Sequence, residues 1–236
     1  FSILEYIPAP FEVKLTPDKE EYISKDNIEI QANGNYYFGV PVQNGEVEYT
    51  VSSQNYYFDK YDGWCFGSCS YDYYWYSYDD YYSYGDKFIS RNKTTLDENG
   101  KALITEKIDL QDIFKDTENI VGKIIVIDAT VKNSFGQAVS AQSSVIVHPG
   151  DFYLAVNSEP SFIGKNQDFT LKAKSVTTEG KELSVKNIKA EIYRKEWVYS
   201  KRQGTSGSYN YVWEMEKELI KEFNFNTDKN GNYSTN

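Results

Sequence analysis

The chain contains the same succession of β-rich segments twice, and this internal repeat restricts its fold more than any other feature. Residues 11–15 (FEVKL) open the first copy, and residues 152–156 (FYLAV) open the second, 141 positions later. Each copy continues through a polar stretch and alternating apolar and polar residues to an Asp-x-Asn-Gly turn, at 97–100 and at 228–231. Self-similarity over this distance is typical of tandem structural units. Five residues follow the second turn, so we expect the second unit to be truncated at its C-terminal end.

The strand pattern indicates an all-β protein. Tyr, Thr, Val and Ile are plentiful, apolar residues recur with a period of two, and no long stretch has the 3.6-residue period of a helix. Predicted strands lie at 11–16, 27–38, 45–52, 86–92, 101–108, 122–132 and 137–148 in the first copy, and at 152–157, 168–176, 188–199 and 211–225 in the second. Short strands separated by turns favour tandem sandwiches of the immunoglobulin or fibronectin type III kind over a small barrel.

Alternation also predicts which side chains face the core. In the third predicted strand, Val47, Tyr49 and Val51 alternate with charged or polar residues and are expected to point inward. In the sixth, we expect Ile124 and Val126 to point inward and, less strictly, Ala129 and Val131.

The segment 148–151 (HPGD) marks the domain boundary, because Pro and Gly end the last strand of the first copy. We therefore expect one domain over 1–149 and a second over 150–236. The second copy begins at once, and domains joined with so little slack pack together or hold a fixed angle.

The net charge of −10 argues against an electrostatic grip on nucleic acid or on anionic lipid. These residues include no apolar run of membrane-spanning length and no signal peptide. A membrane anchor would therefore lie outside them.

The least usual segment is a Tyr-rich insertion in the first domain, at about 54–86. It carries 11 Tyr between Tyr56 and Tyr84, interspersed with Asp. One interpretation is a binding surface, because Tyr and Trp give a large contact area at low entropic cost. The alternative is a long hairpin that covers its own sheet edge or wedges between neighbouring domains. The candidate contact residues are Tyr71, Tyr73, Tyr74, Trp75, Tyr76 and Tyr78.

Cys65 and Cys69 are the two cysteines of the chain, and both lie in this insertion. Their Cys-Phe-Gly-Ser-Cys spacing favours a local disulfide, with free thiols as the alternative. A zinc site would need further Cys or His ligands nearby, and none is present.

No residue set indicates catalysis, a cofactor or a metal. His148 is the only histidine, and no motif supplies the nucleophile and acid that charge-relay chemistry requires. We expect a structural role for it, either solvated or in an interdomain hydrogen bond. The turns at 97–100 and 228–231 lack the later ligands of a calcium loop and are expected to be Asx-Gly turns between hairpin strands.

Several motifs together resemble the macroglobulin-like domains of bacterial α2-macroglobulins. They are residues 36–51 (YYFGVPVQNGEVEYTV), the turn 96–100 (LDENG), the passage 144–151 (SVIVHPGD), and the hairpin around Trp197 and Trp213. The resemblance implies large secreted or periplasmic endopeptidase inhibitors, which use a bait segment and, in many members, a reactive thioester. A thioester needs Cys followed at a short distance by Glu-Gln, whereas Cys65 precedes Phe-Gly-Ser and Cys69 precedes Ser-Tyr-Asp.

The resemblance therefore implies a non-enzymatic scaffold from an extracytoplasmic protease inhibitor, without bait region or thioester. Its partners would be neighbouring domains of the same longer chain and, for the whole protein, proteases. The alternative hypothesis is a cell-surface adhesin or glycan- or protein-binding array that uses the Tyr-rich insertion.

Overall fold

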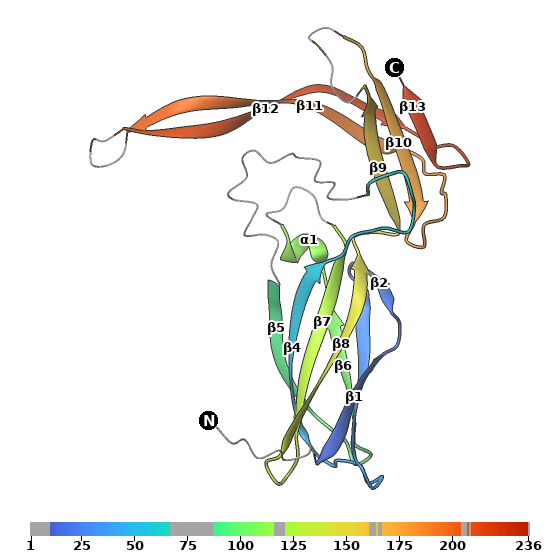
Figure 1. Cartoon of the computed structure of the whole chain (residues 1–236), viewed down its shortest axis with the longest axis vertical. Helices are drawn as coiled ribbons and strands as arrows, with labels where there is room; N and C mark the ends of the chain where they lie inside the picture. The colour runs from blue at the N-terminus through green and yellow to red at the C-terminus, as the bar shows by residue number, and fades with distance from the viewer. Residues whose placement is uncertain are drawn as a thin grey trace, which may run out of the picture. The chain divides into compact units, whose positions relative to one another are not determined.

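The computed structural model describes residues 10–66, 87–115, 121–160, 164, 167–203, 207 and 209–235. The chain forms two compact units (Figure 1). Unit 1 comprises residues 1–155 with 178–180, and unit 2 comprises residues 156–177 with 181–236. The regular secondary structure of the described residues is strand, as predicted, apart from one short helix. No helix in these ranges has the length and apolar character that crossing a bilayer requires.

Unit 1 is a sandwich of two sheets (Figure 1). The smaller sheet is antiparallel, with the strand order β1 (Phe11–Pro17), β3 (Asn27–Tyr36), β6 (Lys101–Lys107). The larger sheet has the strand order β2 (Glu21–Ile23), β8 (Ala138–His148), β7 (Lys123–Lys132), β4 (Glu46–Asn55), β5 (Lys87–Thr95). Its strands are antiparallel except for the pair β2–β8.

The core of unit 1 lies between the two sheets and follows from period-two alternation. On β1, every second side chain from Phe11 is buried, and on β4 the predicted residues Val47, Tyr49 and Val51 are buried. Tyr49 also joins the sheets, because its hydroxyl donates a hydrogen bond to the Glu106 carboxylate on β6 at 2.8 Å.

The prediction for β7 is wrong in its first half. Ile125 and Ile127 are fully buried and belong to the main core together with Ala129 and Val131. Ile124 is half-buried, and Val126 is buried but lies outside the main core. Four consecutive apolar residues open this strand, so the pattern cannot fix which face points inward.

Two short elements were not predicted. β2 pairs parallel to β8, so the chain leaves the smaller sheet after β1 and joins the larger one. The helix α1 (Leu110–Ile113) begins at Asp109, whose carboxylate accepts hydrogen bonds from the first-turn amides of Gln111 and Asp112.

The turn 97–100 has the predicted Asx-Gly geometry. The Asp97 carboxylate accepts hydrogen bonds from the amides of Asn99 and Lys101, both at 2.8 Å, and Gly100 has a φ of +70°. The hairpin expectation is wrong, however, because β5 and β6 belong to different sheets. The carbonyl of Gly100 instead accepts a hydrogen bond from the amide of Gly34 on β3, at 2.8 Å.

Unit 2 repeats part of this arrangement. It contains β10 (Thr170–Thr177) and β13 (Asn232–Thr235), which belong to a three-stranded sheet with the order β9 (Phe152–Glu159), β10, β13. The first half of β9, up to Ala155, is assigned to unit 1 and the remainder to unit 2. Unit 2 also contains a long two-stranded ribbon made of β11 (Ile188–Gln203) and β12 (Tyr209–Phe225) (Figure 1).

The repeated sequence corresponds to repeated hydrogen bonds. The Asp228 carboxylate accepts from the amides of Asn230 and Asn232, as Asp97 does in its own turn. The carbonyl of Gly231 accepts from the amide of Ser175 at 2.8 Å, as Gly100 accepts from Gly34. β9, β10 and β13 therefore correspond to β1, β3 and β6. β13 was not predicted, although the repeat itself contained the signal, since a strand also follows Gly100.

Candidate functional sites

The candidate contact residues Tyr71, Tyr73, Tyr74, Trp75, Tyr76 and Tyr78 lie outside the described residues, as does Cys69. Their role as a binding surface and the disulfide between Cys65 and Cys69 therefore stay predictions. The described part of the insertion ends at Phe66 and can be placed.

The described part of the Tyr-rich insertion packs within unit 1. Phe58 and Phe66 form an isolated β-bridge and are both buried. The ring of Phe58 lies 4.2 Å from the ring of Tyr153, and the ring of Phe66 lies 5.3 Å from that of Phe58. These residues behave as core, in agreement with the packing interpretation for this part of the insertion.

His148 is the last residue of β8, and its ring makes an edge-on contact with the ring of Tyr153, with centroids 5.6 Å apart. His148 is 1% exposed, so the solvated alternative is wrong. It does form hydrogen bonds, but with residues of unit 1 rather than across a domain boundary. Its Nδ1 lies 2.8 Å from the hydroxyl of Tyr153, and its Nε2 lies 3.1 Å from the carboxylate of Glu21 on β2. A neutral imidazole protonated at Nε2 satisfies both contacts, because Nε2–H donates to Glu21 and Nδ1 accepts from Tyr153.

The burial of His148 favours this neutral form. Burial lowers the pKa of His148, and this effect outweighs the opposing influence of the Glu21 carboxylate. For Glu21, burial opposes ionisation, but hydrogen bonds from Lys60 and His148 prevail and lower the pKa of the carboxyl group. The Lys60 ammonium lies 2.6 Å from Glu21 and also donates to the carbonyl of Thr178 at 3.1 Å. Glu21, Lys60, His148 and Tyr153 therefore form a hydrogen-bonded cluster in which His148 and Tyr153 are buried, whereas the side chains of Glu21 and Lys60 stay partly exposed.

This cluster is suited to structural support. Both ring nitrogens of His148 are engaged and the ring is inaccessible to solvent, so a substrate cannot exchange a proton with it. Sequence reasoning did not identify Glu21, which lies 127 positions from His148. Within the described ranges, no group of three or more His, Cys, Asp or Glu side chains is placed to hold a metal ion.

The β11–β12 ribbon presents a second feature, an exposed aromatic surface. Its cross-strand pairs include Tyr199 opposite Trp213 and Trp197 opposite Met215. Side chains of directly opposed residues share one face of a ribbon. We define the aromatic face as Tyr193, Lys195, Trp197, Tyr199, Lys201, Tyr209, Tyr211, Trp213, Met215, Lys217 and Leu219.

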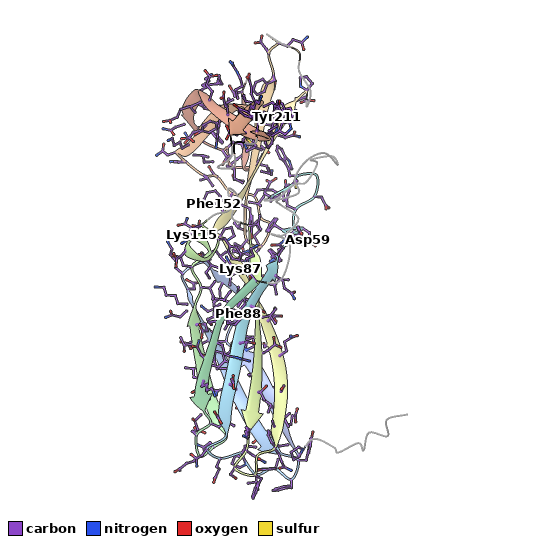
Figure 2. All side chains as sticks on the ribbon, turned by 90° about the vertical axis from the view of Figure 1, so that its left-hand side faces the viewer. Asp59, Lys87, Phe88, Lys115, Phe152 and Tyr211 are labelled. Carbon is purple, nitrogen blue, oxygen red and sulfur yellow. The ribbon has the colours of Figure 1, made fainter. Side chains whose placement is uncertain are left out.

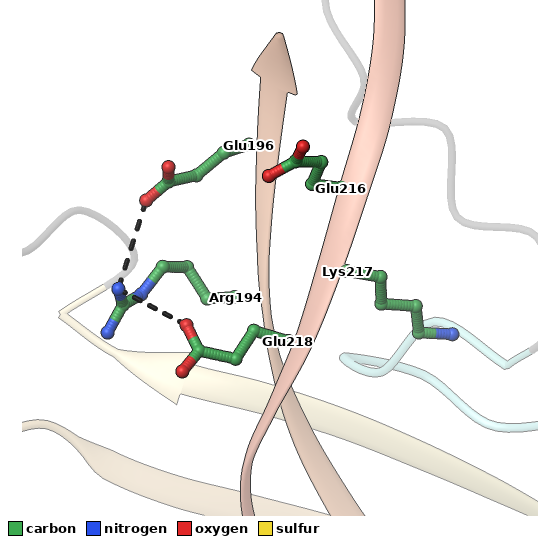
Figure 3. Close-up of a pocket in the computed structure, with 5 residues that line it drawn as sticks. All are labelled: Arg194, Glu196, Glu216, Lys217 and Glu218. Atoms are coloured by element: carbon green, nitrogen blue, oxygen red, sulfur yellow. Dashed lines mark ion pairs between the residues drawn. The ribbon is translucent and has the colours of Figure 1, made fainter.

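The opposite face of the ribbon is charged and carries mainly carboxylates. Arg194 forms ion pairs there with Glu218 at 3.3 Å and with Glu196 at 3.9 Å (Figure 3). These residues line a shallow depression together with Glu216, while Lys217 points away from the Arg194 group (Figure 3). We call Arg194, Glu196, Glu214, Glu216 and Glu218 the glutamate face. The alternation of aromatic and charged residues in 193–199 and 211–217 was the signal for both faces.

The chain is similar to known proteins both in sequence and in structure. No family model matches the chain. An α2-macroglobulin homologue from Nostoc sp. is 39% identical over 54 residues, which make up 23% of this chain and 3% of that protein.

Solved structures match over nearly the whole chain. The native conformation of Escherichia coli α2-macroglobulin matches 98% of this chain with a TM-score of 0.59 and 12% identity. Salmonella α2-macroglobulin reacted with methylamine matches 98% with a TM-score of 0.57 and 13% identity. Escherichia coli α2-macroglobulin activated by porcine elastase matches 97% with a TM-score of 0.58 and 14% identity. The chain spans 14% to 20% of the length of these proteins. In sequence over 54 residues, and in fold over nearly its whole length, this chain is therefore similar to bacterial α2-macroglobulins and matches their macroglobulin domains.

Proposed function

We propose that this chain is a structural scaffold of an extracytoplasmic, α2-macroglobulin-like endopeptidase inhibitor and that it performs no catalysis. The observation that supports this most strongly is the match of 98% of the chain to the native conformation of Escherichia coli α2-macroglobulin. The enclosed state of His148, the only histidine, agrees with a supporting role.

The internal construction of unit 1 suits a body that transmits force. Its two sheets enclose one apolar core, and the hydrogen bond from Tyr49 to Glu106 links them directly. Close-packed interiors deform little, so such a unit moves as a body when a neighbouring segment is displaced. In the proposed mechanism, protease cleavage at a bait elsewhere in the parent protein displaces the units without unfolding them.

The proposal includes the domain organisation. We place a macroglobulin-like sandwich at 1–149, with the Tyr-rich insertion, and a second at 150–236. Their partners would be neighbouring domains of the parent chain, and proteases would be targets of the whole inhibitor. The net charge of −10 disfavours nucleic acid as a partner, and membrane attachment would require an anchor outside these residues. The alternative of an adhesin array is not favoured by the family relationship.

The test is incubation of the full-length parent protein with porcine elastase, followed by measurement of its hydrodynamic radius and of protease retained on gel filtration. We expect cleavage at an exposed segment outside the strands of both units, a change in radius, and co-elution of elastase. Cleavage that changes neither the radius nor the elution of elastase would overturn the inhibitor proposal.

A further inference from the structure

We infer that the aromatic face of the β11–β12 ribbon is a docking surface for an extended acidic polypeptide segment rich in apolar or aromatic side chains. This inference does not depend on the proposed function. It starts from exposure: Trp197, Tyr199, Tyr209, Tyr211 and Trp213 are each more than half exposed, and Tyr211 is labelled in Figure 2. Contiguous exposed aromatic side chains on a folded protein are typical of interaction sites.

Most of the aromatic face has no counterpart among the strands that are repeated in the two units. Asn55, the last residue of β4, corresponds to Glu196 at an offset of 141, and Lys87, the first residue of β5, corresponds to Glu218 at an offset of 131. Residues 197–217 therefore occupy the connection that the Tyr-rich insertion occupies in the first copy. Most of the aromatic face lies on this elaboration, beyond the strands that have counterparts in unit 1.

The charges on the aromatic face determine which sign of charge its partner should carry. The charged side chains within the aromatic face are Lys195, Lys201 and Lys217, whereas the glutamate face carries four carboxylates and Arg194. A carboxylate, that of Glu191, borders the aromatic face and accepts a hydrogen bond from the Tyr193 hydroxyl, but it is already paired with Lys189 at 2.7 Å. The ammonium of Lys201 lies 4.1 Å from the ring centre of Tyr209, and that of Lys217 lies 4.2 Å from the ring centre of Tyr193. Cations held among aromatic rings complement carboxylates set among apolar groups.

The ring geometry favours a polypeptide over a polysaccharide. Tyr199 and Tyr211 are stacked, with ring centres 4.9 Å apart and planes 3° apart, and Trp213 lies 4.9 Å from Tyr199. The ring faces are thus partly covered by one another and by lysines, whereas sugars bind by stacking on open ring faces. Apolar and aromatic side chains can pack against ring edges in T-shaped contacts.

The experiment measures binding of a fluorescent twelve-residue peptide of alternating Tyr and Asp to the full chain by anisotropy. Two other ligands are measured for comparison. A Tyr-Lys peptide of equal length tests the sign of the charge, and polygalacturonate tests an acidic polysaccharide in place of a polypeptide. We expect saturable binding of the Tyr-Asp peptide that weakens as salt increases, with at least tenfold weaker binding of the Tyr-Lys peptide and of polygalacturonate.

Two variants alter the aromatic face and one controls for the glutamate face. Trp213→Thr and the double variant Lys201→Gln/Lys217→Gln should each weaken peptide binding at least tenfold, while Glu196→Gln/Glu216→Gln should leave it within twofold. The lysine substitutions retain the length of the side chain, so they test the charge even if Trp213→Thr perturbs the ribbon. The inference is overturned by absence of binding, by equal binding of the Tyr-Lys peptide, by preference for polygalacturonate, or by equal losses in the control variant.

Discussion

The Nδ1 atom of His148 lies 2.8 Å from the hydroxyl oxygen of Tyr153, five positions further along the chain. Both residues belong to unit 1 and both are buried. Pro149 and Gly150 end β8 between these two residues. The hydrogen bond therefore keeps the chain that follows β8 attached to unit 1. The following predictions concern this contact and the repeated turns.

Tyr153→Phe should lower the free energy of unfolding of the chain by about 1–2 kcal/mol, because it leaves Nδ1 of the buried His148 without its hydrogen-bond donor. The ring packing on Phe58 is retained in this variant. Urea denaturation measures the loss. The matched control is Tyr57→Phe, whose ring is 60% exposed and which should change the stability by less than about 0.5 kcal/mol. Equal effects of the two substitutions would contradict the importance of the contact.

The free energy of unfolding should decrease as the pH falls below about 6.5, the ordinary pKa of histidine. Burial lowers the pKa of His148 in the folded chain, against the attraction of Glu21 and Glu179 and together with repulsion from Lys60. The unfolded chain therefore takes up a proton first, so stability is lost between the unfolded and the folded pKa. The lowered pKa of Glu21 adds a second loss at more acidic pH, below about 4.5.

His148→Gln separates these two contributions, because the chain has a single histidine. Urea denaturation between pH 7.5 and pH 4 should show a flat profile near pH 6.5 in the variant, while an acid loss persists at lower pH because Lys60 still holds the Glu21 carboxylate. An unchanged slope near pH 6.5 would show that the titration of His148 does not control stability.

Gly100→Ala should destabilise the chain more than Gly136→Ala, although both glycines have a positive φ, of +70° and +79°. The left-handed conformation costs about 1–2 kcal/mol at either position. A Cβ at Gly100 would lie 2.5 Å from the carbonyl oxygen of Gly34, whereas at Gly136 the nearest atom is the Lys132 Cε at 4.0 Å. We expect a further cost of about 1–3 kcal/mol at Gly100, as in overpacked cores. Thermal unfolding measures both, and equal losses would contradict the close approach to Gly34.

Asp97→Ala should lower the melting temperature, whereas Asp97→Asn should largely preserve it. The side-chain oxygen accepts two backbone hydrogen bonds, which an amide oxygen can also accept. Asn133 does so in the turn before β8, where its Oδ1 accepts from the amides of Phe135 and Gln137. An equal loss for Asp97→Asn and Asp97→Ala would show that the charge, rather than the hydrogen-bonding geometry, stabilises the turn.

Local patterns in the sequence were sufficient to predict the positions of most strands. β1, β4 and β6 alternate clearly, and their predicted positions agree with the structure within a few residues. β2 and α1 have three and four residues, which is too short for any periodic signal. The uniform apolar run that opens β7 concealed its inward face.

The contacts of the candidate sites depend on residues far apart in the chain. Glu21 and Lys60 converge on His148 only through pairing of β2 with β8 and packing of the insertion. No local pattern encodes that convergence, whereas the alternation on β11 and β12 was readable before the fold was known.

The central claim, that unit 1 is a load-bearing body displaced without unfolding, is tested most directly by amide hydrogen exchange. Exchange would be measured on the full-length parent protein before and after elastase cleavage. We expect the amides of β3, β4 and β7 to keep the same protection in both states, with changes confined to loops and to segments outside the sandwich. Loss of protection in β4 and β7 after cleavage would show that the sandwich itself opens, and would contradict the scaffold account.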